Sequence, residues 1–322
     1  MTVTNSYRTG IWPRSCARLI LMFLLLPIGA AAQAGGKEAA PNTRSITVIT
    51  EPGAVVWIND VRFGAAGSDG KLSLITSATG RATMRVRADG FKEAVKTLLP
   101  ADSGDVRVAL AATDDPAELA FQEAERLTLV DRDRAAAAYQ KAIKLRPGYI
   151  QAHVGLARVL SEARKPDAAI KAIRDLRRIK PGVAEASAIE GRVEKESGDE
   201  VKAIAAFERA IKEGAGFQPE AYTGLGLLYS ERADGASAEG DYEAEAANYA
   251  LAAKHYKIAA RQLIGSPDAV VVYQLLGLIY EKQKLYDEAV ATYEEFLKLF
   301  PDSDEAPAIR SFIVQIKKQS NP

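Results

Sequence analysis

The feature that most constrains the fold of this chain is a repeat with a period of 34 residues in its C-terminal two thirds. Small, aromatic and helix-ending residues appear first as Ala135, Tyr139, Ala142 and Pro147, and 34 residues later as Ala169, Ile173, Leu176 and Pro181. Most of the set returns as Ala203, Phe207 and Ala210, and again as Ala289, Tyr293, Phe296 and Pro301. The spacing places these side chains on one face of a helix. One helical hairpin of this size cannot bury its apolar face, so the repeats are expected to stack.

A second pattern, in the helix that precedes each of these, carries a small residue where paired helices cross. It occurs as Leu156-Ala157, as Gly191, as Gly226 between Tyr222 and Tyr229, and as Gly277 between Tyr273 and Tyr280. A helix-turn-helix of this period with these positions resembles the tetratricopeptide repeat (TPR) family. The resemblance implies an all-α helical-hairpin solenoid over residues 114–303, followed by a capping helix and tail in 304–322. We place its five units near residues 116–148, 150–183, 184–217, 219–265 and 270–303.

The fourth unit is longer than the others, with an insertion near residues 233–248. Residues 233–240 have a loop-like composition, and a long helix is expected from about 241 to 264. In the capping helix, an apolar inner face is predicted for Ile309, Phe312, Ile313 and Ile316.

Three tyrosines lie seven residues apart on one face of the long helix, at Tyr242, Tyr249 and Tyr256. Ala252, Tyr256 and Ala259 fit the repeat pattern in full, so this register is predicted to pack in the solenoid. The stripe has two interpretations: it fills the core, or it offers a binding surface around Tyr249 where the helix overhangs its neighbours.

Residues 45–112 have a period of two instead, as in Ala82, Met84, Val86 and Ala88. About six short strands separated by turn signals predict a small all-β sandwich, antiparallel and able to fold apart from the helices. Glu51-Pro52-Gly53-Ala54, Val56-Trp57-Ile58-Asn59 and Gly90-Phe91 resemble the PEGA domain family, although Asp60 replaces its usual turn glycine. The resemblance implies a module found on exported or membrane-bound bacterial proteins, with no catalytic residues.

The strand face opposite the expected β core carries Trp57 with Arg85 and Arg87, and Arg81 and Arg107 share this pattern. In one interpretation these residues bind a glycan or cell-wall polymer. In the other, the arginines are solvated and Trp57 packs under a loop or against the neighbouring helices.

Residues 1–34 have the pattern of a secretory signal peptide, with an apolar segment at 19–28 and an Ala32-Gln33-Ala34 cleavage site. An uncleaved anchor is the alternative, although the apolar run is far shorter than a bilayer span needs. Cys16 lies before the apolar run, which argues against a lipoprotein. We therefore expect a periplasmic or secreted protein that starts near Gly35 and has a flexible linker at 35–44.

The sequence offers no catalytic constellation. His153 and His255 lie in different repeats without partners at metal-ligand spacing, and no phosphate-binding loop, HExxH or nucleophile-elbow motif is present. Basic and acidic residues are equal in number, at 42 each, so binding of nucleic acid is not indicated. We predict a non-enzymatic protein that needs no metal or cofactor.

In the TPR family, fixed positions of the first helix of each unit face the concave groove. The resemblance places there Gln151, Val154, Arg158, Ser161, Arg192, Lys195, Glu220, Thr223, Leu227, Ser230, Gln274, Leu278 and Glu281. The sequence therefore predicts an exported scaffold that holds a peptide or protein partner, with glycan binding by the β domain as the alternative. Because the early units carry cations and the later ones exposed leucines, we expect a ligand with an acidic and an apolar end.

Overall fold

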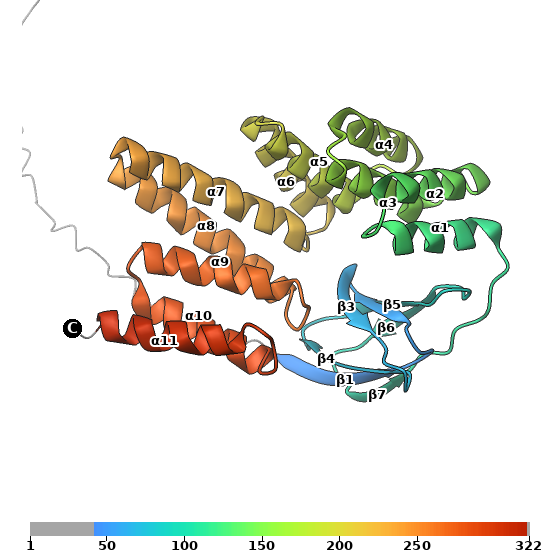
Figure 1. The fold of residues 1–322 in the computed structure, drawn as a ribbon, viewed down its shortest axis with the longest axis horizontal. Coiled ribbons are helices and arrows are strands. Elements are labelled where there is room, and N and C mark those ends of the chain that lie inside the picture. Colours follow the sequence, from blue (N-terminus) through green and yellow to red (C-terminus); the bar gives the residue numbers. More distant parts are fainter. Residues whose placement is uncertain (1–41, 321–322) are drawn as a thin grey trace, which may run out of the picture. The chain divides into compact units, whose positions relative to one another are not determined.

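The protein is described by a computed structural model, which places residues 42–320. The predicted signal peptide, most of the linker and the last two residues lie outside the described residues. The described chain begins with seven strands and continues with eleven helices (Figure 1). The strands are β1 (Thr43–Ile49), β2 (Val55–Ile58), β3 (Val61–Ala65), β4 (Lys71–Ser77), β5 (Ala82–Arg87), β6 (Ala94–Leu98) and β7 (Gly104–Arg107).

The strands form two sheets, ordered β4-β1-β7 and β3-β2-β5-β6. Alternate residues point inward, so that Ile46, Val56, Met84 and Val86 lie in one buried cluster. The prediction of a wholly antiparallel domain is wrong in one place, because β7 pairs with β1 in parallel. A parallel neighbour needs a long crossover, here residues 50–103, which the local strand patterns did not reveal.

The turn between β2 and β3 has only two residues, because Ile58 pairs directly with Val61. Asn59 and Asp60 both have positive φ, 49° and 64°, which is the geometry of a tight hairpin. The Asn59 side chain accepts a hydrogen bond from the Thr83 backbone N–H at 2.8 Å, which ties the tip to β5. Asp60 therefore adopts the positive-φ conformation that a glycine would adopt in this turn.

Five antiparallel helical hairpins and a final helix follow the strands (Figure 1). The pairs are α1 (Pro116–Leu127) with α2 (Arg132–Leu145), α3 (Ile150–Glu162) with α4 (Pro166–Ile179), α5 (Ala184–Glu196) with α6 (Glu200–Glu213), α7 (Pro219–Glu239) with α8 (Tyr242–Gln262), and α9 (Ala269–Lys282) with α10 (Tyr286–Leu299). The final helix is α11 (Ala306–Ser320). Aspartate caps fix several starts: Asp115 accepts from the Ala117 N–H at 2.9 Å, and Asp131, Asp199 and Asp241 cap α2, α6 and α8.

Glycines set the distance between paired helices. A Cβ on Gly226 would lie 2.5 Å from the buried ring of Tyr256, and one on Gly277 would overlap the ring of Tyr293. The repeat pattern therefore reflects aromatic rings that lie directly on glycine backbone.

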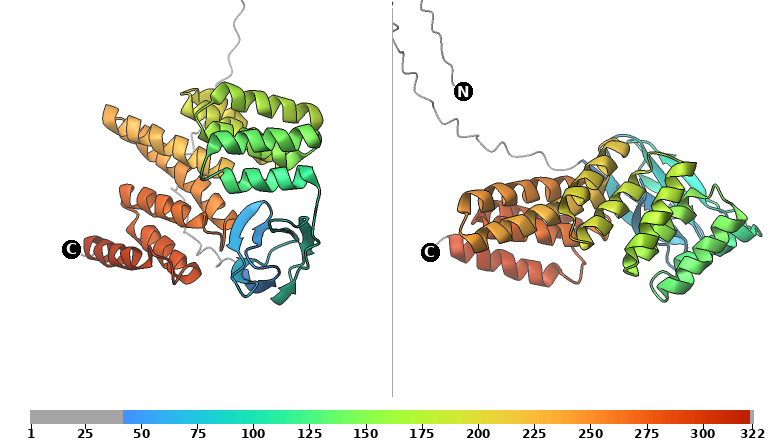
Figure 2. Two further views of the ribbon diagram at one scale, coloured as in Figure 1. Left: turned by 45° about the vertical axis from the view of Figure 1, so that its right-hand side comes forward. Right: turned by 90° about the horizontal axis from the view of Figure 1, so that it is seen from above.

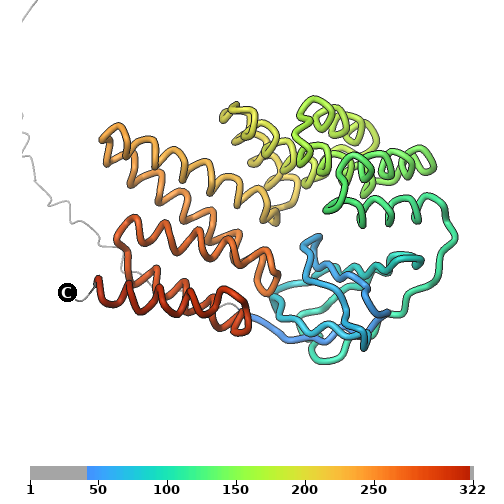
Figure 3. Tube along the Cα trace, in the orientation of Figure 1, coloured from blue at the N-terminus to red at the C-terminus, as the bar shows by residue number. Residues whose placement is uncertain are grey.

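The loop predicted at residues 233–240 is wrong, because α7 continues as helix to Glu239 and ends at Gly240, whose φ is +79°. Both α7 and α8 have 21 residues, and they extend past the ends of their neighbours (Figures 2 and 3). Ala233 is fully buried, and the adjacent Asp234 accepts hydrogen bonds from Tyr249 and Lys282. These contacts outweigh the low helix propensity of Gly235.

The tyrosine stripe divides between core and surface. Tyr249 and Tyr256 are 4% and 0% exposed, whereas Tyr242 is 73% exposed. Tyr249 therefore belongs to the core and cannot contact a partner itself, whereas Tyr242 is exposed on the overhang. On α11, Ile309, Ile313 and Ile316 are buried as predicted, but Phe312 is 46% exposed because it lies at the edge of the inner face.

The β domain is joined to the helices at two places. Gln122 of α1, 2% exposed, accepts from the Gly90 N–H and donates to the Phe91 carbonyl, both at 2.8 Å. In the turn between α8 and α9, the buried Ser266 hydroxyl donates to the carbonyl of Arg62 at 3.0 Å. One apolar cluster includes the β core and residues of α7–α11. This shared packing argues against the expectation that the two parts unfold separately.

Candidate functional site

A cavity of about 1340 Å³ lies where the first helices of units two to five meet the β domain. Its helical wall comes from α3, α5, α7 and α9, with Arg158, Arg192, Thr223, Leu227 and Val271 among its residues. The opposite wall is the β2–β3 hairpin at residues 58–63, together with residues of the 76–83 segment. The cavity therefore occupies the predicted concave groove, and the chain's own β domain forms one of its sides.

The cations of the helical wall are paired within the chain. Arg158 donates to Glu220 at 2.9 Å, Arg192 lies 3.5 Å from the same carboxylate, and Lys195 pairs with Glu231 at 2.6 Å. Burial acts to raise the pKa of Glu220, but Arg158 and Arg192 more than offset it, so this pKa is lowered. Glu220 in turn helps to raise the pKa of Arg158. The expected cationic end of the groove is thus internally neutralised, which removes the reason to expect a strongly acidic ligand.

Two further carboxyl groups in the cavity have raised pKa values. Burial raises the pKa of Glu185 on α5, and Asp60 at the hairpin tip adds to the rise by repulsion. Burial also raises the pKa of Asp268, which precedes α9. The carboxyl groups of Asp60 on the hairpin and Glu185 on α5 therefore lie on opposite walls of the cavity and repel each other.

The predicted groove residues divide into two groups. Arg158, Arg192, Lys195, Glu220, Thr223 and Leu227 line the cavity together. The cavity lining does not include Gln151, Val154, Ser161, Ser230, Gln274, Leu278 or Glu281. Ser161 is 2% exposed and accepts from Arg192 at 3.3 Å, and Glu281 accepts from the Tyr293 hydroxyl at 2.7 Å. The cavity thus brings six of the predicted positions together and leaves the other seven outside its lining.

The comparisons with known proteins address the helical part. Sequence profiles of the tetratricopeptide repeat match residues 131–193 and 237–304. The chain contains tetratricopeptide repeats. Neither TPR profile reaches the β domain, and no curated protein matches the chain.

Solved TPR structures resemble the chain at low identity. Yeast Tom70 has a TM-score of 0.50 at 17% identity, with 64% of this chain and 41% of that chain covered. MamA has a TM-score of 0.40 at 24% identity, with 59% of this chain and 94% of that chain covered. A thermophilic TPR protein of Thermus thermophilus has a TM-score of 0.43 at 17% identity, with 62% of this chain and 98% of that chain covered. At these identities the likeness concerns the fold alone.

Sequence reasoning missed several parts of the TPR cavity. Val271 of α9 lines the cavity and is 57% exposed, and it lies one helical turn before the predicted Gln274. The hairpin tip was also missed as a wall of the site. Asn59-Asp60 is a recognisable two-residue turn signal, but nothing in the local sequence says which surface such a tip contacts.

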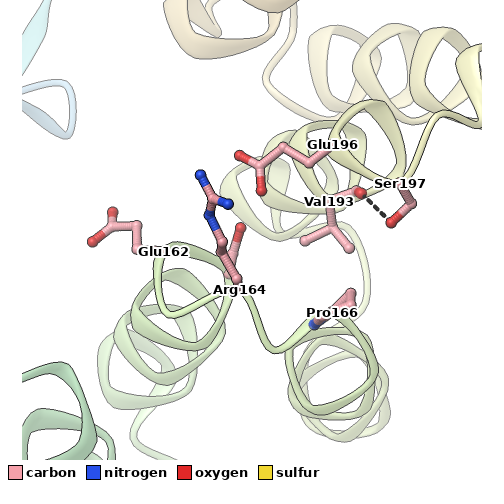
Figure 4. A pocket seen from close by; sticks show the side chains of 7 residues that line it. Glu162, Arg164, Pro166, Val193, Glu196 and Ser197 are labelled. Atoms are coloured by element: carbon pink, nitrogen blue, oxygen red, sulfur yellow. Dashed lines mark hydrogen bonds between the residues drawn. The ribbon is translucent and has the colours of Figure 1, made fainter.

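A smaller hollow of about 500 Å³ lies between units two and three, and Figure 4 shows its lining. It includes Ser161, Glu162, Arg164, Glu196 and Ser197. The Ser197 hydroxyl donates to the Val193 carbonyl at 2.8 Å, so it is held by its own helix. The hollow contains no nucleophile paired with a base, and we assign it no function.

The residues predicted for glycan contact lie at the junction with α1. The guanidinium of Arg87 stacks between Trp57 and Phe121, at 5.2 and 4.3 Å from their ring centres, and pairs with Glu93. Arg87 is 7% exposed, so the expectation that it faces solvent is wrong. The Arg85 guanidinium also lies over the Trp57 ring, 5.7 Å from its centre, and pairs with Asp60 at 3.1 Å. The alternation matched a solvent-facing strand surface, but Phe121 of α1 covers Arg87.

The potential metal ligands of the described residues do not converge on a common point. Between residues 42 and 320, no three His, Cys, Asp or Glu side chains converge in a way that could hold a metal ion. His153 hydrogen-bonds the Pro147 carbonyl at 2.9 Å, and His255 stacks on Tyr229 with ring centres 5.5 Å apart. Over the same residues, no helix combines the length and apolarity that crossing a membrane requires.

Proposed function

We propose that this protein is an exported scaffold that holds a segment of a partner protein in its TPR groove. The observation that carries the proposal is the cavity of about 1340 Å³, which the first helices of four successive units line. A space of this kind is large enough for several side chains of an extended peptide. Its wall combines paired charges with the apolar Leu227 and Val271, so the favoured ligand is a peptide of mixed polarity rather than an acidic one.

Export rests on the leader at residues 1–34. We expect the mature protein, isolated from its native cell, to begin near Gly35 and to fractionate with envelope proteins, because the segment combines basic, apolar and small-residue regions. N-terminal sequencing of the purified native protein measures this directly. Intact Met1 on cytoplasmic material would contradict it.

The groove is tested best at Val271. We expect Val271→Asp to weaken partner binding at least about tenfold, because a carboxylate would lose its hydration when an apolar side chain docks on α9. Val271 is 57% exposed, so the variant is expected to remain folded. Affinity is measured by titrating the partner that is first captured with the parent chain from envelope extract.

The matched control is Val314→Asp on α11, where the valine is 55% exposed and lies outside the cavity lining. It introduces the same charge at a similar exposure and should leave the affinity unchanged. Equal effects of the two variants, or none from Val271→Asp, would place the partner elsewhere.

A further inference from the structure

The face of the TPR groove that should receive a partner is partly occupied by the chain itself. The β2–β3 hairpin tip and residues of the 76–83 segment form the wall opposite α3, α5, α7 and α9. The tip is a preformed element, since Asn59 is bonded to β5 and Asp60 to Arg85. A ligand that lies along the helices would meet this wall.

Two attachments hold the β domain over the groove, and they differ in kind. At α1 the attachment includes the covalent connection through residues 108–115, the two hydrogen bonds of Gln122 and the stacking of Arg87 on Phe121. At the second attachment, the backbone of the α8–α9 turn packs directly against the β domain. A Cβ on Gly265, whose φ is +78°, would overlap the carbonyl oxygen of Ile75, and Ser266 bonds to Arg62.

The second attachment has no covalent connection, so it is the one that can release while the first acts as the hinge. The space beside it is unfilled, and the hairpin brings Asp60 toward Glu185, where repulsion contributes to the raised pKa of Glu185. Like charges across a contact lower its stability. Opening would also expose part of the apolar cluster that joins the β domain to α7–α11, so the covered state is the dominant one.

We propose that the β domain is a hinged cover of the TPR groove, anchored at α1 and released at the Gly265–Ser266 turn. The proposal rests on the groove being the binding site, and it adds that access to the groove is regulated. A partner must then compete with the hairpin, and its apparent affinity is reduced by the fraction of molecules that are covered.

The test needs no partner, so its outcome is separate from that of the proposed function. In full-length protein with Cys16→Ser, Thr223→Cys places a groove thiol on the helical wall of the cavity, and Ser311→Cys places a surface thiol on the exposed side of α11. The rate of labelling with a polyethylene-glycol maleimide reports access to each site. In the parent background, the groove thiol should react much more slowly than the surface thiol.

Gly265→Ala should raise the labelling rate of the groove thiol about tenfold and leave that of the surface thiol unchanged, because the new methyl group collides with the Ile75 carbonyl. The matched control is Gly216→Ala. Gly216 also has a positive φ, +90°, but a Cβ there meets nothing within 4 Å, so the labelling of the groove thiol should not change.

Ser266→Ala removes only the hydrogen bond to Arg62 and should act in the same direction with a smaller effect. If Gly265→Ala loses its helical circular dichroism, the Ser266→Ala variant tests the proposal instead. Its groove thiol should then be labelled faster than that of the parent, and its surface thiol at the same rate. Fast labelling of the groove thiol in the parent, or equal rates in parent and released variants, would overturn the proposal. A cover that opens without any partner binding in the groove would instead count against the proposed function alone.

Discussion

Replacing Phe207 with alanine is expected to lower the free energy of unfolding by about 3–5 kcal/mol. The side chain comes from α6 and is 2% exposed. A Cβ on Gly191 of α5 would lie 2.5 Å from the ring, and one on Gly224 of α7 would overlap it. One ring therefore fills the space between units three and four, and its removal leaves a cavity between two backbones that have no side chains to fill it. Urea unfolding followed by circular dichroism measures the loss.

The control for this prediction is Phe312→Ala on α11. That ring is 46% exposed, so its truncation should cost less than about 1 kcal/mol. Because repeat units are stabilised by their neighbours, the Phe207 variant is also expected to broaden the unfolding transition as units three and four uncouple. Equal losses in the two variants would show that the ring does not join these units.

The helical part of the fold was predictable because its signal is local and repeated. Ala203, Phe207 and Ala210 recur with the spacing of one helix face, and they pack against α5 of their own hairpin and α7 of the following one. The same holds for Gly226 and Tyr256, which meet across one hairpin. A pattern that repeats at a fixed period also fixes the neighbour against which it packs.

Features that depend on distant contacts were not predictable in the same way. The 233–240 segment has the composition of a loop, but the burial of Ala233 and the bonds of Asp234 to Tyr249 and Lys282 keep it helical. Arg87 has the spacing of an exposed strand residue, but α1 covers it.

The candidate site combines both kinds of information. The repeat positions placed Arg158, Glu220 and Thr223 on one concave wall, and the structure brings them together. The opposite wall comes from strands that lie far earlier in the chain. Its place is set in part by Gly265 and Ser266, two small residues in a turn with no distinctive motif. Only the tertiary structure shows that a small hydroxyl there meets the carbonyl of Arg62.

The second large effect is expected at Glu220, the carboxylate that two arginines share. Glu220→Gln should lower the free energy of unfolding by about 2 kcal/mol at neutral pH, since Arg158 and Arg192 would keep their charges without this partner. A fully buried pair would lose about 3–5 kcal/mol, but these side chains are 27–34% exposed, so solvent compensates in part. The control is Glu294→Gln, which breaks a pair with Lys317 in which both side chains are about half exposed, and it should have almost no effect.

The same pair of variants predicts how the effect changes with pH. The pKa of Glu220 is lowered from its ordinary 4.5 in the folded protein, so the folded state binds this proton less readily than the unfolded chain does. Its contribution is therefore complete above pH 4.5 and is lost as the pH falls through the folded-state value. Below that value the parent carries a neutral side chain at position 220, as the glutamine variant always does, so the difference between them should disappear. Glu185 and Asp268, whose pKa values are raised, act with the opposite sign in both proteins. Repulsion from Glu220 contributes to the raised pKa of Asp268, so the contribution of Asp268 is expected to be smaller in the glutamine variant. A difference that persists unchanged in acid would mean that the loss comes from altered packing rather than from charge.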